Sequence, residues 1–196
     1  MKVSFKKGLL TAAMAGLVTV GVTGCGGGES ASSGVTPQTM ADSLFAVMES
    51  DRTTYTKLII GRLAVKEKVI KASEHWEDEK ALVLPAQMFR YGAERVAEKT
   101  DKFSYSLLSL WPINKQNAPK SDIEKEGLKY IADNPGKNFY GEETLGGQKY
   151  YTAMYADVAV AQACIKCHNE HKDTPRTDFK MGEVMGGVVI RIPLEL

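Results

Sequence analysis

FYGEETLGGQKYYTAMYADVAV, residues 139–160, carries strong strand signals. Aromatic and β-branched residues favour extended structure, and they lie here on both sides of Gly146-Gly147. A glycine pair is typical of a two-residue hairpin turn, because glycine tolerates the positive φ angles that such a turn needs. We therefore predict two antiparallel strands joined by a tight turn.

Further strands are predicted on both sides of this hairpin. KFSYSLLSLW, residues 102–111, is rich in aromatic and apolar residues, and EVMGGVVIRIPLEL, residues 183–196, has a strand interior at residues 189–192. Between the first of these strands and the hairpin, Ser121 and Glu124 form a capping-box pair that opens a short helix.

Two longer helical patterns come earlier in the chain. Apolar residues recur at helical spacing in residues 39–76, where Thr39 could cap one long helix or the first of two. Residues 81–99 predict a second helix, with Pro85 in its first turn, where proline is tolerated. Because helices come first and strands second, we expect an α+β fold with an antiparallel sheet.

The N-terminus resembles a bacterial lipoprotein signal. Lys2, Lys6 and Lys7 precede an apolar run that is too short for a membrane span of ~20 residues. The run ends in VTGC, so Cys25 would become the lipid-bearing first residue of the mature chain. The alternative is ordinary secretory cleavage nearby, which would leave Cys25 as a free thiol.

This reading divides the chain into a lipoprotein signal peptide over residues 1–24, a flexible Gly- and Ser-rich tether over residues 25–39, and one domain over residues 40–196. Glycine rather than aspartate at position 26 favours the outer membrane, by the general sorting rule for lipoproteins. We therefore expect a protein of the bacterial cell envelope that lies in the periplasm and is held to the membrane by its lipid anchor.

The charge of the mature chain excludes other classes of partner. Removal of the signal peptide leaves 22 Lys and Arg against 24 Asp and Glu, a net charge of −2. Without a basic excess we expect no nucleic-acid binding. No second apolar run is long enough to cross a bilayer.

CIKCH, residues 164–168, is a C-x-x-C-H motif, which is the attachment signature of c-type haem. The thiols of Cys164 and Cys167 would add to the porphyrin vinyl groups as thioethers, and His168 would coordinate the iron from the proximal side. Such attachment takes place after export, which the N-terminal signal provides. If Cys25 carries lipid, the motif holds the only remaining thiols, and we expect one covalent haem c.

Three other readings of the motif stay open. A thioredoxin-like redox pair also contains C-x-x-C, but it expects a βαβ setting. A structural zinc site needs four ligands, and here Cys164, Cys167, His168 and His171 would have to supply all of them from one turn. A plain disulfide would close a very small loop and stabilise little.

The stretches YSLLSLWPINKQNAPKSDIEKEGL (residues 105–128), GGQKYYTAMYADVAVAQACIKCHNEH (146–171) and GEVMGGVVIRIPL (182–194) resemble a family of small haem c proteins and sensor domains with a PAS-like fold, long catalogued as a domain of unknown function. The resemblance implies a central antiparallel sheet with N-terminal and flanking helices, and a haem held by C-x-x-C-H beside the sheet. It also implies electron transfer, or redox or ligand sensing. One family member uses a cysteine as second axial ligand, and this chain has none left for that role.

The distal ligand is therefore open between Met88, His75 and water. Met88, Gly92 and Arg95 share one helix face, where the glycine would let a flat macrocycle approach and Arg95 could meet a propionate. The alternative for Met88 is a role as core filler. His75 has polar neighbours, and its alternative is an ordinary surface histidine.

Three further residues near the motif or the C-terminus are candidates for supporting roles. His171 lies too close to His168 in sequence to reach the opposite face of one iron, so we expect it to bond a propionate or the backbone. Arg176 and Arg191 could pair with haem propionates, because guanidinium groups bind carboxylates in bidentate fashion.

Two functions fit these features. The first is a membrane-tethered mono-haem cytochrome that passes one electron between partners in the envelope, including a redox partner protein whose identity the sequence does not give; it is favoured because no output segment follows the haem domain. The second is a haem-based redox or small-ligand sensor acting through a separate partner. We do not expect an enzyme, since no distal acid–base arrangement is evident.

Overall fold

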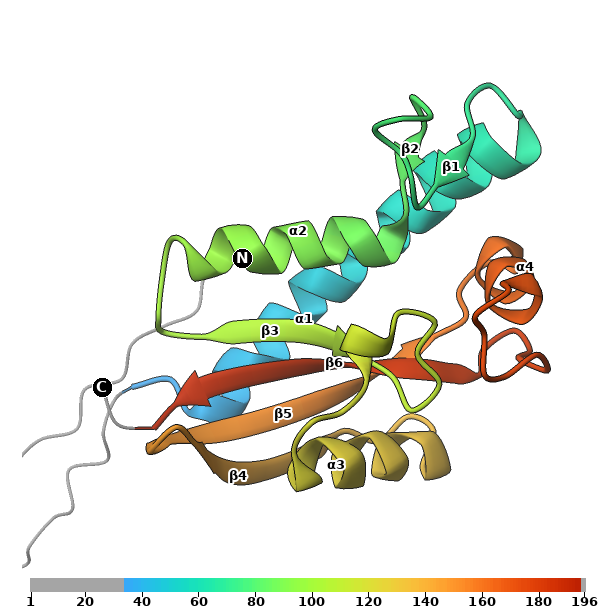
Figure 1. The fold of residues 1–196 in the computed structure, drawn as a ribbon. Helices are drawn as coiled ribbons and strands as arrows, with labels where there is room; N and C mark the ends of the chain where they lie inside the picture. The colour runs from blue at the N-terminus through green and yellow to red at the C-terminus, as the bar shows by residue number, and fades with distance from the viewer. Residues whose placement is uncertain (1–33, 195–196) are drawn as a thin grey trace, which may run out of the picture. The chain divides into compact units, whose positions relative to one another are not determined.

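The structure is a computed structural model that describes residues 34–194 (Figure 1). The predicted signal peptide, Cys25 and most of the tether lie outside these residues. In chain order the elements are α1 (Pro37–Thr54), the π-helix η1 (Tyr55–Lys66), β1 (Ala72–Ser73), β2 (Leu82–Val83), α2 (Pro85–Ala97), β3 (Ser104–Leu108), the short 3₁₀-helix η2 (Lys115–Asn117), α3 (Asp122–Asp133), β4 (Phe139–Leu145), β5 (Gln148–Val158), α4 (Gln162–Glu170) and β6 (Val184–Pro193).

Four strands form one antiparallel sheet in the order β3-β6-β5-β4. The predicted hairpin is β4–β5, in which Leu145 pairs with Gln148. Gly146 and Gly147 make its turn with φ angles of 59° and 86°, in the region that glycine adopts at low cost. The predicted α+β fold with an antiparallel sheet is confirmed.

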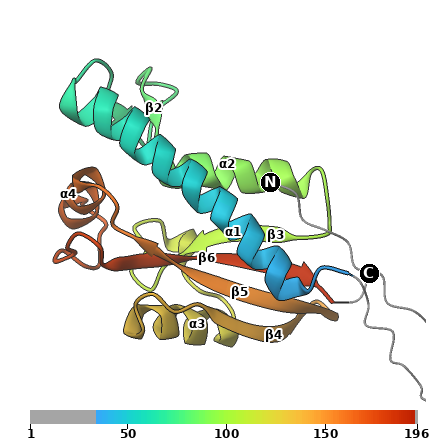
Figure 2. The same ribbon diagram turned by 180° about the vertical axis from the view of Figure 1, so that it is seen from behind.

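Helices cover both faces of this sheet (Figures 1 and 2). The helices α1 and α2 lie on one face and α3 lies on the other, and side chains alternate between the two along β6. Val188 and Ile190 pack with the α1 and α2 side, whereas Val189 packs with Leu128 and Ile131 of α3. The sheet is therefore buried on both sides, which explains why β6 is almost uniformly apolar.

The first helix begins and ends earlier than the sequence predicts. The Thr36 side chain caps α1 by accepting a bond from the Thr39 N–H at 3.1 Å, so Thr39 lies inside the helix and residues 37–39 are not tether. The helix continues through η1 but stops at Lys66, and Lys68 has a positive φ of 54°. Residues 67–76 are predicted as helix but instead contain β1 and the turn that follows it; Val69 is 71% exposed and has no core to cover.

The predicted starts of two other helices, α2 and α3, are confirmed. Pro85 is the first residue of α2, where its missing N–H is not needed. Ser121 and Glu124 form the capping box of α3, because the Ser121 hydroxyl accepts from the Glu124 N–H and the Glu124 carboxylate accepts from the Ser121 N–H. The two-residue parallel pair β1–β2 is not predicted by the sequence.

The end of β5 places α4 at one end of the sheet. After Val158 the backbone N–H of Ala159 donates to Glu183, and the N–H of Gly182 donates back to Ala159, so the chain entering α4 is tied to the chain entering β6. The helix α4 then contacts η1. Among the described residues no helix is both long and apolar enough to cross a membrane.

Candidate haem-attachment site

The helix α4 carries all three residues of the C-x-x-C-H motif. Cys164 and Cys167 are three residues apart, so their side chains lie near each other along one side of the helix. Cys164 is half-buried and Cys167 is exposed, and both thiols are free. His168 follows directly, one full turn after Cys164.

His168 is half-buried, and its Nδ1 atom is buried without a hydrogen-bond partner in the structure. Its ring meets the Phe179 ring edge to face, with centroids 6.0 Å apart. Burial lowers the pKa of His168, while the nearby Asp157 carboxylate raises it and Arg52 lowers it. The imidazole is therefore neutral at neutral pH, which is the form that coordinates a metal.

The electrostatics of the thiols disfavour the thioredoxin-like reading. Although much of the Cys167 residue is exposed, partial desolvation of its thiol raises the pKa of Cys167, and the Glu74 carboxylate adds to this effect. A reactive redox thiol needs the opposite, a pKa lowered by positive charge or a helix N-terminus. The zinc reading is also disfavoured, because no three His, Cys, Asp or Glu side chains within residues 34–194 are grouped to hold a metal.

The same features fit a covalently attached haem. Two free thiols lie one helical turn apart, and a neutral imidazole with an unsatisfied buried nitrogen follows the second. Such an orphaned polar atom costs free energy unless a partner satisfies it. The motif residues therefore have the chemistry and the spacing that thioether attachment and proximal ligation require.

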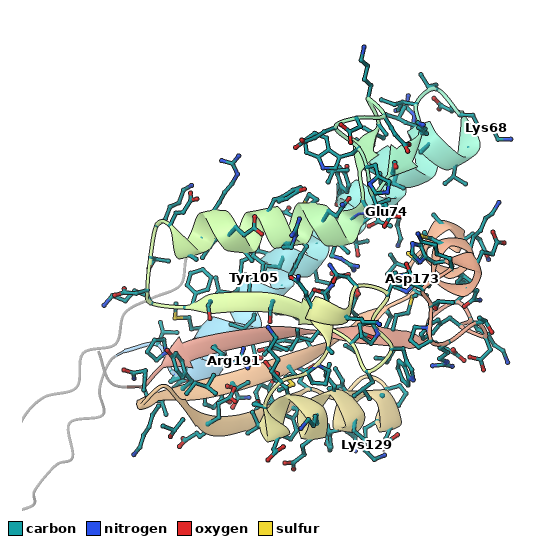
Figure 3. All side chains as sticks on the ribbon, viewed as in Figure 1. Lys68, Glu74, Tyr105, Lys129, Asp173 and Arg191 are labelled. Carbon is teal, nitrogen blue, oxygen red and sulfur yellow. The ribbon has the colours of Figure 1, made fainter. Side chains whose placement is uncertain are left out.

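The segment between β1 and β2 brings His75 toward α4. One Glu74 oxygen, Oε1, lies 3.6 Å from His75 Nε2 and 3.7 Å from His171 Nε2, so this carboxylate links the two imidazoles. Figure 3 shows Glu74 on the side that faces α4. His75 is 68% exposed. His171 is mostly buried, and its Nδ1 accepts from the backbone N–H of Asp173, the kind of backbone role predicted for it.

Met88 also lies near this segment, but the predicted reason for a haem beside it is wrong. The Gln87 side chain donates to the Glu74 carbonyl at 2.8 Å, which holds the start of α2 against the segment that carries His75. A Cβ added at Gly92, however, would lie 2.5 Å from the Tyr105 hydroxyl. The glycine makes room for Tyr105 of β3 and not for a macrocycle.

The structure places Arg95 and Arg191, the predicted propionate partners, away from α4. Arg191 binds Glu124 at 2.6 Å and Glu143 at 2.8 Å in a largely buried ionic cluster. It lies seven residues along β6 from Val184, where the chain next to α4 begins, a separation of about 23 Å along an extended strand. Arg95 is exposed near the C-terminal end of α2, from which the chain runs to β3, whose first residue pairs with Arg191.

Arg176 lies close to the motif but its guanidinium is already engaged. It forms ion pairs with Asp178 at 2.6 Å and Glu183 at 3.0 Å. Its Cζ atom lies 4.8 Å from the centroid of the Trp111 ring and 4.2 Å from that of Phe179. The structure thus uses Arg176 to hold two aromatic rings, which differs from the predicted propionate contact.

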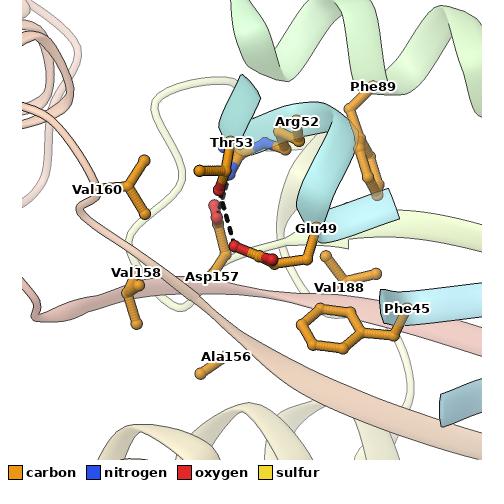
Figure 4. Close-up of a pocket in the computed structure, with 10 residues that line it drawn as sticks. All are labelled: Phe45, Glu49, Arg52, Thr53, Phe89, Ala156, Asp157, Val158, Val160 and Val188. Carbon is orange, nitrogen blue, oxygen red and sulfur yellow. Dashed lines mark hydrogen bonds and ion pairs between the residues drawn. The ribbon is translucent and has the colours of Figure 1, made fainter. Parts of the chain in front are cut away.

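An ion pair between Arg52 of α1 and Asp157 of β5 was missed by sequence reasoning. Both side chains are largely buried beside a small cavity that Phe45, Phe89 and Val188 complete (Figure 4). The Nε atom of Arg52 has no partner in the structure. A signal was present, because Asp157 is a lone charge in the apolar run YTAMYADVAV, and buried charges need a partner.

Comparisons with known proteins give the family and the fold. A family model described as Tll0287-like matches residues 33–193. Among solved structures, the chain is similar to the crystal structure of the cyanobacterial heme-protein Tll0287, with a TM-score of 0.53 and 15% sequence identity over 82% of this chain and 98% of that chain. The comparison with curated proteins gives no match.

Proposed function

Because the chain belongs to the Tll0287-like family, a family of haem proteins, we propose that it is a mono-haem c-type cytochrome that transfers single electrons in the cell envelope. In this proposal Cys164 and Cys167 bind one haem covalently and His168 is its proximal ligand. The bound haem supplies a one-electron iron couple.

One observation carries the proposal. His168 lies on a helix with two free thiols, of which Cys167 is its direct neighbour and Cys164 lies one turn earlier. Haem iron binds a histidine through one ring nitrogen, so what supports proximal ligation is the position of His168 directly after Cys167 on this helix. The neutral state of His168 follows from its burial and leaves a lone pair available.

The proposal includes a location for the protein in the cell envelope. Lipid on Cys25 would tether the mature chain to the periplasmic side of a membrane, and the glycine at position 26 favours the outer membrane. A redox partner protein in the envelope would exchange electrons with the haem. The absence of a basic excess in the mature chain supports a protein partner over nucleic acid.

We assign the distal position to His75 in preference to Met88. The Oε1 atom of Glu74 lies near the imidazoles of both His75 and His171, and His171 comes directly after α4 in the chain. His75 is exposed, so its imidazole can turn toward an iron without breaking a packed core. Ligation by two protein groups would leave no site for a substrate, in keeping with an electron carrier and not an enzyme.

A sensor is the second candidate, and the exposure of His75 favours it. A ligand held only by an exposed segment can be displaced, which would open the iron to a small diatomic molecule. The response would then pass through α4 and the sheet to a separate partner protein.

Optical spectra test both candidates on the full-length protein. The alkaline pyridine haemochrome of a c-type haem, retained after extraction with acidified acetone, is the expected result. Loss of the pigment into the acetone contradicts covalent attachment. Ferrous protein that does not bind carbon monoxide supports the carrier, and rapid binding of carbon monoxide supports the sensor.

A further inference from the structure

A line of aromatic side chains leads from α4 to the protein surface. The His168 and Phe179 ring centroids are 6.0 Å apart, and those of Phe179 and Trp111 are 5.8 Å apart, both pairs nearly perpendicular. These distances are typical of edge-to-face packing in direct contact. Trp111 is half-buried, and it lines a surface hollow together with Pro135 and Gly182.

The thioether side of the motif meets the same rings. Cys164 and Trp111 both pack against a small core cluster formed by Ala159, Phe179 and Met185. A haem on this chain would be linked through the sulfur of Cys164 and through His168. Cys164 packs against the cluster that contains Phe179, and the His168 ring contacts the Phe179 ring.

Neighbouring polar groups hold the rings of Phe179 and Trp111 in place. The side-chain amide of Asn169 in α4 makes two hydrogen bonds to the backbone of Phe179, each of 3.0 Å. The guanidinium of Arg176 lies over both rings and is itself anchored by Asp178 and Glu183. These contacts fix the positions of the two rings relative to α4.

We propose that electrons enter and leave the haem through Phe179 and Trp111, with Trp111 as the point of exchange at the surface. Electron tunnelling weakens steeply across gaps, so a row of rings in contact couples two sites better than loosely packed groups do. The inference rests on the proposed function, since it needs a haem on α4. In the step, ferrous iron loses one electron and a one-electron acceptor such as a ruthenium(III) complex gains it; no bond changes and no proton moves.

A fixed photoactive label tests this route. A ruthenium complex on a bipyridylalanine residue introduced at Pro135 lies beside Trp111 and uses neither thiols nor imidazoles. After a laser flash we expect slower electron transfer between label and haem in Trp111→Leu and in Phe179→Leu than in the parent, and an intermediate rate in Trp111→Phe, which keeps a ring. The control is Tyr151→Leu, because Tyr151 packs on Tyr140 in the β4–β5 hairpin and not on the ring row, and its rate should equal that of the parent.

A second measurement does not depend on electron transfer. The indole N–H signal of Trp111, assigned by its loss in Trp111→Phe, should broaden when the haem is oxidised to a paramagnetic ferric state. Unbroadened Trp111 signals, or parental rates in both leucine variants that still carry haem and the parental fold by circular dichroism, overturn the route. Absence of covalent haem from the parent protein instead overturns the proposed function, so the two failures are distinguishable.

Discussion

The side-chain amide of Asn169 binds the backbone of Phe179 on both sides. Its Nδ2 donates to the Phe179 carbonyl, and its Oδ1 accepts from the Phe179 N–H, each at 3.0 Å. Asn169 follows His168 directly in α4, and Phe179 is ten residues away, near the start of β6. The helix that carries the motif is thereby fixed to the segment whose ring packs on the proximal histidine.

Asn169→Ala should destabilise the fold. The substitution leaves the N–H and carbonyl of Phe179 without partners in a partly buried position, which we expect to cost about 1–3 kcal/mol of unfolding free energy. Urea denaturation followed by circular dichroism measures the change. Asn138→Ala is the control, because the Asn138 amide makes a solvent-exposed hydrogen bond to the Tyr140 hydroxyl, and we expect an effect within about 0.5 kcal/mol. Equal losses of unfolding free energy in the two variants would contradict a stabilising role of the two Asn169–Phe179 hydrogen bonds.

Cys164→Ala and Cys167→Ala should each reduce the yield of covalent haem, because each removes one thioether. The intact mass of the purified protein and the haemochrome band report the change. Lys166→Ala is the matched control, since Lys166 lies between the two cysteines, is exposed and has no role in the attachment. Full covalent haem content in both cysteine variants would contradict the assignment of Cys164 and Cys167 as the attachment residues.

His75→Ala should convert the ferric haem from low to high spin, because the variant removes the proposed distal ligand. Met88→Leu should leave the spectrum unchanged, since leucine replaces a half-buried apolar side chain of similar volume. Electron paramagnetic resonance of the ferric protein distinguishes the two spin states. High-spin signals in the methionine variant alone would transfer the role to Met88.

Glu124→Gln should weaken the fold at neutral pH and reduce the loss of stability in acid. Burial alone would raise the pKa of Glu124, but the N–H groups of Lys120 and Ser121 and the guanidinium of Arg191 together lower it below 4.5. A carboxyl with a lowered pKa stabilises the fold above the unfolded-state pKa, and this contribution is lost as the pH falls through the folded-state pKa.

Unfolding free energies measured by urea denaturation from pH 7 down to pH 3 test this expectation. At pH 7 we expect a loss of about 1–3 kcal/mol, because charge-assisted hydrogen bonds are removed. The difference between parent and variant should begin to shrink as the pH falls below 4.5 and should disappear as the pH passes the lower folded-state pKa of Glu124. Asp122→Asn is the control, since Asp122 is in the same helical turn but its side chain is fully exposed. Parallel curves at every pH would show that Glu124 is not the group responsible.

Features set by neighbouring residues could be predicted from the sequence. The hairpin turn depends on Gly146 and Gly147 alone, and the capping box depends on Ser121 and Glu124. The C-x-x-C-H motif is also local, and α4 presents it on a single helix. In each case residues within four positions of one another supply the whole physical cause.

Features that join distant segments could not be predicted. The roles of Arg191 depend on strand register and on α3, which bring Glu124 and Glu143 to it from far along the chain. Gly92 had the right helical periodicity for a haem face, but Tyr105 occupies that side. The end of the first helix at Lys66 was missed because the apolar pattern of residues 67–76 continues, although Val69 has nothing to pack against.

The π-helical winding of η1 has a consequence for the design of variants. Each residue in a helix with i→i+5 hydrogen bonds turns the chain less than in an α-helix, so Tyr55–Lys66 sets the direction in which the chain leaves toward residues 67–84. A sequence change that restored ordinary α-helical winding would rotate that outgoing segment as a unit. His75 would then be carried away from the motif although neither His75 nor its neighbours in the sequence had been altered.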